Sequence, residues 1–145
     1  MTIIALSARG KLASYPIHDD ERHMNSLTAE VAVVGGGPAG LTTAIALATA
    51  GVETVLVGAP PPSPDHRTTA LLTGSVAALT ALGVWERCRD HAAPLRLMRI
   101  VDDTARLLRA PEVSFDAAEI GLEAFGHNSE NRHLLAALAG RAREL

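Results

Sequence analysis

Aromatic residues are scarce in this chain: one Trp, one Tyr and two Phe make up 3% of its 145 residues. Alanine, leucine and valine must therefore build the core, which favours close packing of helices on a sheet. The single cysteine, Cys88, excludes an internal disulfide framework and is typical of a reducing compartment. No apolar stretch reaches the roughly 18 residues of a membrane span, and residues 1–7 lack the basic start of a signal peptide.

Clusters of basic residues are also lacking. The formal net charge is −3, which argues against a nucleic-acid partner. Six histidines are scattered without cysteines or carboxylates at ligand spacing, so no metal site is predicted. The single cysteine and the lack of a signal peptide or membrane span lead us to expect a cytoplasmic protein.

A strand, a glycine turn and a helix follow one another early in the chain. Apolar residues 31–34 precede the segment GGGPAG at 35–40, and small helix-compatible residues continue to Gly51. Residues 52–57 give a second strand-like run, so a β-α-β unit is complete within about thirty residues. The spacing predicts a dinucleotide-binding fold of the α/β class.

Each glycine of this turn has a physical role in holding a pyrophosphate. Gly35 permits the tight turn, Gly37 lets the backbone approach the phosphates, and Gly40 lets the helix pack closely. The start of the following helix offers free N–H groups and a positive dipole end to the anion.

The remaining chain predicts a mixed α/β arrangement. Four prolines between positions 60 and 64 indicate an extended loop. We expect a helix at 74–82 closed by Gly83 and a short helix at 86–91. Strands at 95–101 and 106–109 should form a hairpin that begins a second sheet, and a further short strand is expected at 113–115. The last element is a helix at 130–143, capped by Asn128-Ser129.

Two regions follow from this pattern. Residues 1–26 lack periodicity and contain a second methionine, Met24, so we expect either a flexible N-terminal extension or a biological start at Met24. Residues 27–145 form the dinucleotide-binding domain. Because no parallel strand follows the final helix, we expect this region to be the truncated N-terminal portion of a longer domain.

The chain resembles the class A flavoprotein monooxygenases, the para-hydroxybenzoate hydroxylase superfamily, and within it the ubiquinone-biosynthesis hydroxylase family. The resemblance covers about residues 28–145. The segments that support it are VVGGGPAGL at 33–41, RTTAL at 67–71, GSV at 74–76, LGVW at 82–85, and ENR at 130–132 with Leu134 and Leu138.

The resemblance implies a Rossmann-like FAD-binding domain, here incomplete, and an enzyme that uses FAD, NAD(P)H and O2 to hydroxylate a phenolic polyprenyl substrate. It assigns the residues expected to contact FAD and no catalytic side chain or metal: Gly35, Gly37, Pro38, Ala39, Gly40, Arg67 and Asn131. A guanidinium such as that of Arg67 suits a phosphate or ribityl group. The full-length enzyme is expected to act on a small aromatic molecule, without nucleic acid, and to associate peripherally with the inner membrane or with a biosynthetic complex.

One position departs from the expected pattern. An acidic residue about twenty positions after the glycines should bind the adenosine ribose, and Gly58 stands there. The ribose contact is therefore lost or is supplied by backbone or a loop residue, which argues against a standard NAD site.

Two alternatives remain open. In the first, the chain is a non-catalytic piece that binds FAD weakly or not at all. In the second, it belongs to another FAD- or NAD-linked oxidoreductase that uses the same β-α-β unit. In either case we expect the isolated 145 residues to be inactive as a hydroxylase.

Overall fold

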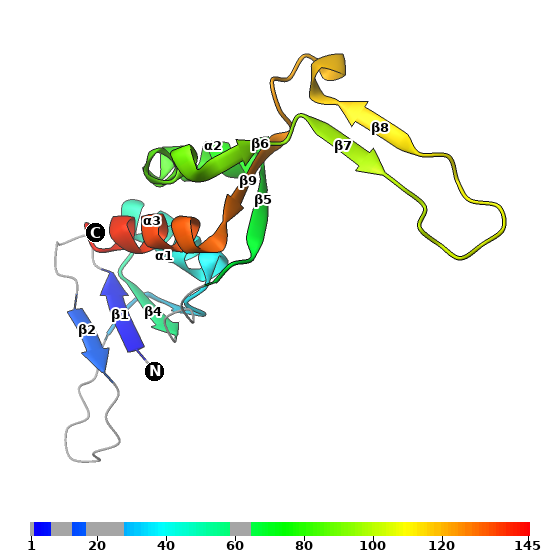
Figure 1. Cartoon of the computed structure of the whole chain (residues 1–145). Helices are drawn as coiled ribbons and strands as arrows, with labels where there is room; N and C mark the ends of the chain where they lie inside the picture. Colours follow the sequence, from blue (N-terminus) through cyan, green and yellow to red (C-terminus); the bar gives the residue numbers. More distant parts are fainter. Residues whose placement is uncertain (1, 7–12, 17–27, 59–64) are drawn as a thin grey trace.

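The computed structural model shows a body of two small sheets and three helices, from which a two-stranded arm projects (Figure 1). It describes residues 2–6, 13–16, 28–58 and 65–145. The first sheet has the strand order β2-β1-β4-β3, the second has the order β5-β9-β6, and the arm is formed by β7 and β8.

The predicted β-α-β unit is present. Strand β3 (Val31–Val34) pairs in parallel with β4 (Thr54–Gly58), and helix α1 (Pro38–Thr49) connects them. The buried residues of α1 recur at helical spacing and lie on one face: Leu41, Ala44, Ile45 and Ala48. Two of the four are alanines, so the helix can lie close to the sheet.

The first sheet also includes strands from the region expected to be a flexible extension. Strand β1 (Thr2–Leu6) runs antiparallel to β4, and β2 (Ala13–Pro16) runs antiparallel to β1. The structure thus differs from the expectation for these two segments. The remainder of residues 1–26 lies outside the described residues, and the domain boundary at 26/27 stays a prediction.

The second sheet brings together segments that are distant in the sequence. Strand β5 (Thr68–Leu72) pairs antiparallel with β9 (Gly126–Glu130), and β6 (Ala92–Pro94) pairs with the other edge of β9. Residues 128–129 therefore belong to a strand and do not form the predicted cap of the last helix, α3 (Asn131–Ala142).

The middle of the chain follows the predicted helical pattern. Helix α2 (Thr73–Ala81) is followed by Gly83, whose φ of +72° is the left-handed conformation that commonly closes a helix. Two short 3₁₀ turns, η1 (Trp85–Arg87) and η2 (Arg89–His91), occupy the position of the expected short helix.

The core lies where α1 and α3 pack together against the sheets. Aliphatic residues dominate it, as the composition requires, and Trp85 contributes the one buried aromatic side chain among the described residues. Besides the residues of α1, the core includes buried side chains from α2 onward, among them Leu79, Val84, Cys88, Leu134 and Leu138. This core fixes α1 and its glycine turn relative to β5 and α3.

The arm consists of β7 (Leu97–Ile100) and β8 (Val113–Asp116), followed by a 3₁₀ turn η3 (Ala117–Ile120). The predicted return strand at 106–109 is wrong, because β7 pairs instead with β8, near the short strand expected at 113–115. The longer connection leaves Leu107 and Leu108 almost fully exposed. No helix among the described residues has the length and apolar character needed to cross a membrane.

Candidate functional site

The glycine turn between β3 and α1 is the first part of the site. Gly35 has a φ of +125°, which an L side chain rarely adopts, and its N–H donates to the Val57 carbonyl at 2.8 Å. A Cβ at Gly40 would overlap the Gly35 carbonyl oxygen. Glycine at position 40 therefore allows α1 to start directly against the turn.

The start of α1 is suited to an anion. Gly37 is the N-cap, it provides no side-chain cap, and the first turn contains no acidic residue. The first N–H groups of a helix have no intrahelical partner and carry the positive end of the dipole. A Cβ built on Gly37 meets no atom within 4 Å, so there is open space beside the turn for a phosphate to approach the backbone.

A groove extends from this helix start across the body. Its volume is about 430 Å³, and residues of α1, β5, α2 and α3 line it. They are Pro38, Ala39, Thr42, Thr43, Thr69, Leu71, Ser75, Ala78, Leu79 and Leu134. The walls combine apolar side chains with hydroxyl groups, as small-molecule sites in proteins commonly do.

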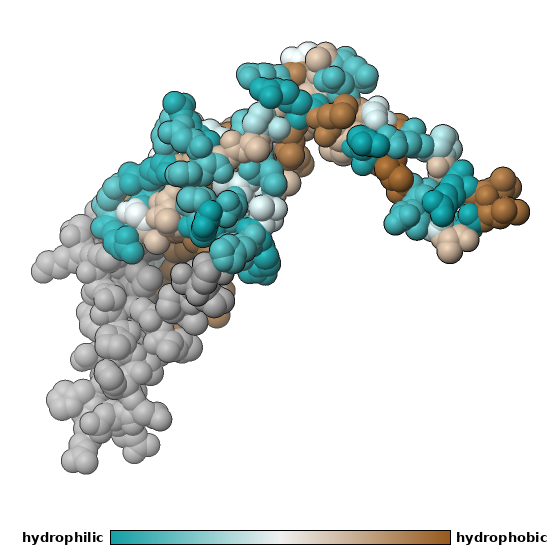
Figure 2. Space-filling view, viewed as in Figure 1, coloured by the Kyte–Doolittle hydropathy of each residue, from teal (hydrophilic) through white to brown (hydrophobic). Residues whose placement is uncertain are grey.

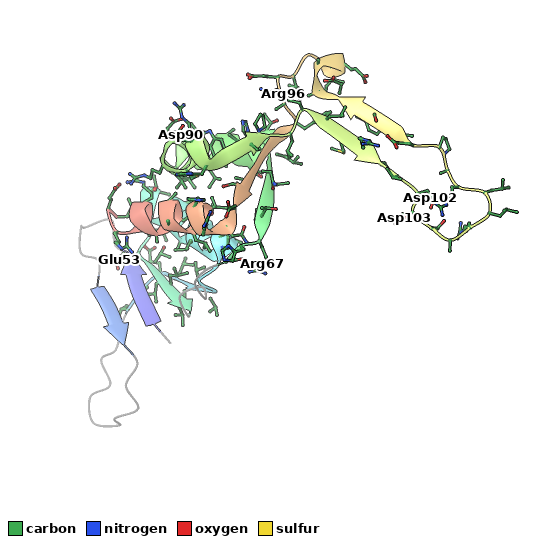
Figure 3. All side chains as sticks on the ribbon, in the orientation of Figure 1. Glu53, Arg67, Asp90, Arg96, Asp102 and Asp103 are labelled. Carbon is green, nitrogen blue, oxygen red and sulfur yellow. The ribbon has the colours of Figure 1, made fainter. Side chains whose placement is uncertain are left out.

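Arg67 and Asn131 come together beside this groove, although they are 64 positions apart in the sequence. Because β5 pairs with β9, the Asn131 N–H donates to the Arg67 carbonyl at 2.8 Å. Figure 3 shows Arg67 where the chain enters β5, close to the beginning of α3. Thr69, which lines the groove, donates to the Asn131 side-chain oxygen.

Asp65 joins the two residues, and sequence reasoning missed it. Its carboxylate accepts hydrogen bonds from Arg67 Nε and Nη2, each at 2.9 Å, and from Asn131 Nδ2 at 3.1 Å. The Arg67 guanidinium, with help from the Asn131 amide, holds the pKa of the Asp65 carboxyl well below its usual range. An aspartate two positions before the arginine is the signal that could have identified it.

Gly58 ends β4 directly beside the glycine turn. A Cβ there would overlap the Gly36 nitrogen and lie 3.0 Å from the Gly36 Cα. The ribose-binding acid expected at this position is therefore sterically excluded in this loop conformation. Glu53, the nearest preceding acid, lies at the opposite end of β4 (Figure 3).

Other candidate groups lie away from the turn. Asp102 and Asp103 lie on the arm (Figure 3), where the Asp102 carboxylate accepts from the Thr104 and Ala110 N–H groups and closes the loop. His91 and His133 stack with ring centroids 3.9 Å apart. Within the part of the chain that the structure describes, no three His, Cys, Asp or Glu side chains form a group that could hold a metal ion.

The comparisons with known proteins agree with this geometry. A family model described as FAD binding domain matches residues 28–138. The 3-demethoxyubiquinol 3-hydroxylase of Escherichia coli (strain K12) is 33% identical over 127 residues, which cover 79% of this chain and 30% of that protein. The para-nitrophenol 4-monooxygenase of Pseudomonas sp. (strain WBC-3) is 43% identical over 63 residues, covering 43% of this chain and 16% of the relative.

Solved structures show the same likeness. The crystal structure of p-nitrophenol 4-monooxygenase from Pseudomonas putida DLL-E4 superimposes with a TM-score of 0.58 and 26% identity, over 79% of this chain and 28% of that one. A tetracycline destructase shares the fold at 16% identity, with a TM-score of 0.52 over 82% of this chain and 29% of the other. The chain thus spans less than a third of the length of each of these relatives.

Proposed function

The chain belongs to the FAD-binding domain family, and from this premise we propose that it holds FAD with the pyrophosphate over residues 35–40. The observation that carries the proposal is the uncapped start of α1, which faces open space at Gly37 and opens into the groove. Helix N–H groups and dipole would bind the phosphates, and Arg67, whose side chain is 81% exposed, is available to a further anionic or polar part of the cofactor.

The likeness to hydroxylases supports an enzyme of the FAD-dependent monooxygenase family. We propose a phenolic ring as its substrate, and more narrowly a polyprenylated ubiquinone precursor, because the E. coli relative is a 3-demethoxyubiquinol 3-hydroxylase. When bound, FAD would accept a hydride from NAD(P)H and activate O2 for hydroxylation. The residues of this chain bind and orient the cofactor, and none is assigned a proton transfer.

Several finer points belong to the same proposal. Gly58 leaves no carboxylate at the end of β4, which favours FAD over NAD as the resident dinucleotide. We also propose that the full-length enzyme works at the cytoplasmic side of a membrane or in a biosynthetic complex, where a polyprenyl substrate is accessible. Inactivity of the isolated 145 residues stays a prediction.

The experiment that tests the proposal compares Gly37→Val with Gly140→Val. Val fits the extended backbone at position 37 (φ −80°, ψ −177°), so the variant should fold while its side chain fills the space meant for phosphate. Gly140 lies in α3, where a Cβ would meet only an ordinary contact at 3.8 Å. Purified proteins are loaded with FAD or, in a parallel sample, with NADH and are then desalted, and the absorbance of the retained flavin or NADH is measured.

We expect wild type and Gly140→Val to retain flavin and Gly37→Val to lose it. Equal retention by all three proteins would overturn the assignment of the pyrophosphate to the glycine turn. Retention of NADH in place of FAD would favour the alternative oxidoreductase, and no retention by wild type would favour a non-binding piece.

A further inference from the structure

The cluster around Asp65 combines one sheltered acid with one exposed base. The Asp65 side chain is 9% exposed, whereas the Arg67 side chain is 81% exposed, although the two form a bidentate ion pair. The backbone N–H of Arg67 also donates to the Asp65 carboxylate at 3.1 Å. The acid is therefore fixed in the protein, and the base extends from it toward solvent.

The bidentate pair uses only one edge of the guanidinium. Nε and Nη2 donate to the two carboxylate oxygens of Asp65, and these are the side-on donors of the group. A guanidinium has five N–H donors in a rigid plane, and among the described residues only Asp65 accepts from this one, through Nε and Nη2. Within that part of the chain, the end formed by Nη1 and the second hydrogen of Nη2 is available. Because Asp65 holds the Nε edge of the guanidinium, this end has a defined direction for a second anion.

The amide of Asn131 is committed to the same cluster. Its nitrogen donates to Asp65 at 3.1 Å, its oxygen accepts from Thr69, and the residue is 7% exposed. These two bonds fix which end of the amide faces Asp65. Asn131 thus donates to Oδ2 of Asp65, the same carboxylate oxygen that accepts from Arg67 Nη2, and both polar ends of its amide are occupied within the cluster.

We propose that Asp65 is a positioning residue, held by Asn131, that aims the free end of the Arg67 guanidinium at the bound cofactor. The inference rests on the proposed function, since it concerns the same FAD site. It assigns different roles to the two residues that sequence reasoning treated alike. Arg67 contacts the cofactor, and Asn131 acts through Asp65.

A double-mutant cycle tests this role by measuring FAD affinity from the quenching of flavin fluorescence. Asp65→Asn keeps the shape of the side chain and removes the charge that anchors Arg67, so we expect Kd for FAD to rise roughly tenfold or more. Arg67→Ala should weaken binding by a similar factor. In the double variant the two effects should not multiply, because Asp65 acts only through Arg67.

Asp90→Asn is the matched control, because Asp90 is 89% exposed and lies on η2, away from the cluster (Figure 3). It should leave Kd unchanged. A second readout needs no FAD: in an NMR titration of the chain without cofactor, the pKa of the Asp65 carboxyl should rise toward its ordinary value in Arg67→Ala.

The outcomes separate this inference from the proposed function. If wild type binds FAD and Asp65→Asn binds equally well, or if the two substitutions multiply, the positioning role is overturned and the proposed function stands. If wild type binds no FAD, both are overturned. An Asp65 pKa that does not respond to Arg67→Ala contradicts the ion pair on which the inference depends.

Discussion

At the scale of single residues, Gly58 shows how a departure from a family pattern can have a steric cause. The sequence shows that an acid is missing from the end of β4, but not why. In the structure the Gly36 backbone occupies the place of a Cβ at this position. The turn and the strand therefore approach each other more closely than any side chain at position 58 permits.

This contact predicts that restoring the acid will not restore a ribose contact. Gly58→Glu should lower the free energy of unfolding by the roughly 1–3 kcal/mol typical of overpacking, and with it the melting temperature. It should also weaken FAD retention, because the glycine turn must shift. Differential scanning fluorimetry and flavin absorbance after desalting measure the two effects. Gly58→Ala should show most of the loss, since the Cβ itself is responsible. Tighter FAD binding by Gly58→Glu would contradict the prediction.

At the scale of elements, the β-α-β unit was predictable because it is local. The apolar run of β3, the glycines and the small residues of α1 are adjacent in the sequence, and the register of β3 with β4 confirms the pairing. Strands β5 and β9 were missed, because both are only five residues long, β9 is polar in sequence, and the two pair with each other across more than fifty residues.

The return strand of the arm was misplaced for a related reason. Leu107 and Leu108 offered an apolar pattern near the turn residues, but the structure leaves them 100% and 88% exposed and pairs Ile100 with Val113. Arg67 and Asn131 were found through the family resemblance, and Asp65 was not. Its role depends on the β5–β9 pairing, which spacing alone does not reveal.

Among the elements, an ion-pair cluster joins η1 to the end of α3. Arg87 donates two hydrogen bonds of 2.8 Å to the Glu144 carboxylate, and Arg141 adds a third at 3.2 Å. The hydrogen bond from Arg87, with a smaller contribution from Arg141, holds the pKa of the Glu144 carboxyl below its ordinary value. A carboxyl group whose pKa is lower in the folded chain contributes stability above its unfolded pKa and loses it as the pH falls through the folded pKa.

Glu144→Gln should therefore lower the melting temperature slightly at pH 7, because the pair is exposed and such pairs contribute little. The difference from wild type should shrink as the pH is lowered below the ordinary carboxyl range. Melting curves from pH 7 to pH 3 measure it. Glu123→Gln, which removes a 93% exposed carboxylate 4.0 Å from Arg96, is the control and should change little. A difference that grows in acid would contradict the assignment.

At the scale of the whole molecule, the arm exposes much apolar surface. Figure 2 shows hydrophobic residues at its tip and along its strands, in contrast to the polar face of the body. Register places the side chains of Met98, Ile100, Val113 and Phe115 on one face of the two-stranded sheet, and each is more than 40% exposed. Exposed apolar area of this kind promotes association.

We therefore predict that the 145-residue chain associates with itself as concentration rises. The double substitution Leu107→Ser/Leu108→Ser should reduce the association without changing the melting temperature, because these side chains are almost fully exposed. Sedimentation velocity over a range of concentrations measures the effect. Unchanged association in the variant would exclude the tip of the arm as its cause.

The pairing of β5 with β9 also sets an order of events during synthesis. Asp65 and Asn131 are 66 positions apart, which at about 5–20 residues per second corresponds to roughly 3–13 s of translation. The glycine turn and both strands that flank it are made before this interval begins. The glycine turn of a nascent chain therefore exists for several seconds before the Arg67 cluster does, so under the proposed function the capture of FAD during synthesis would begin at its phosphates.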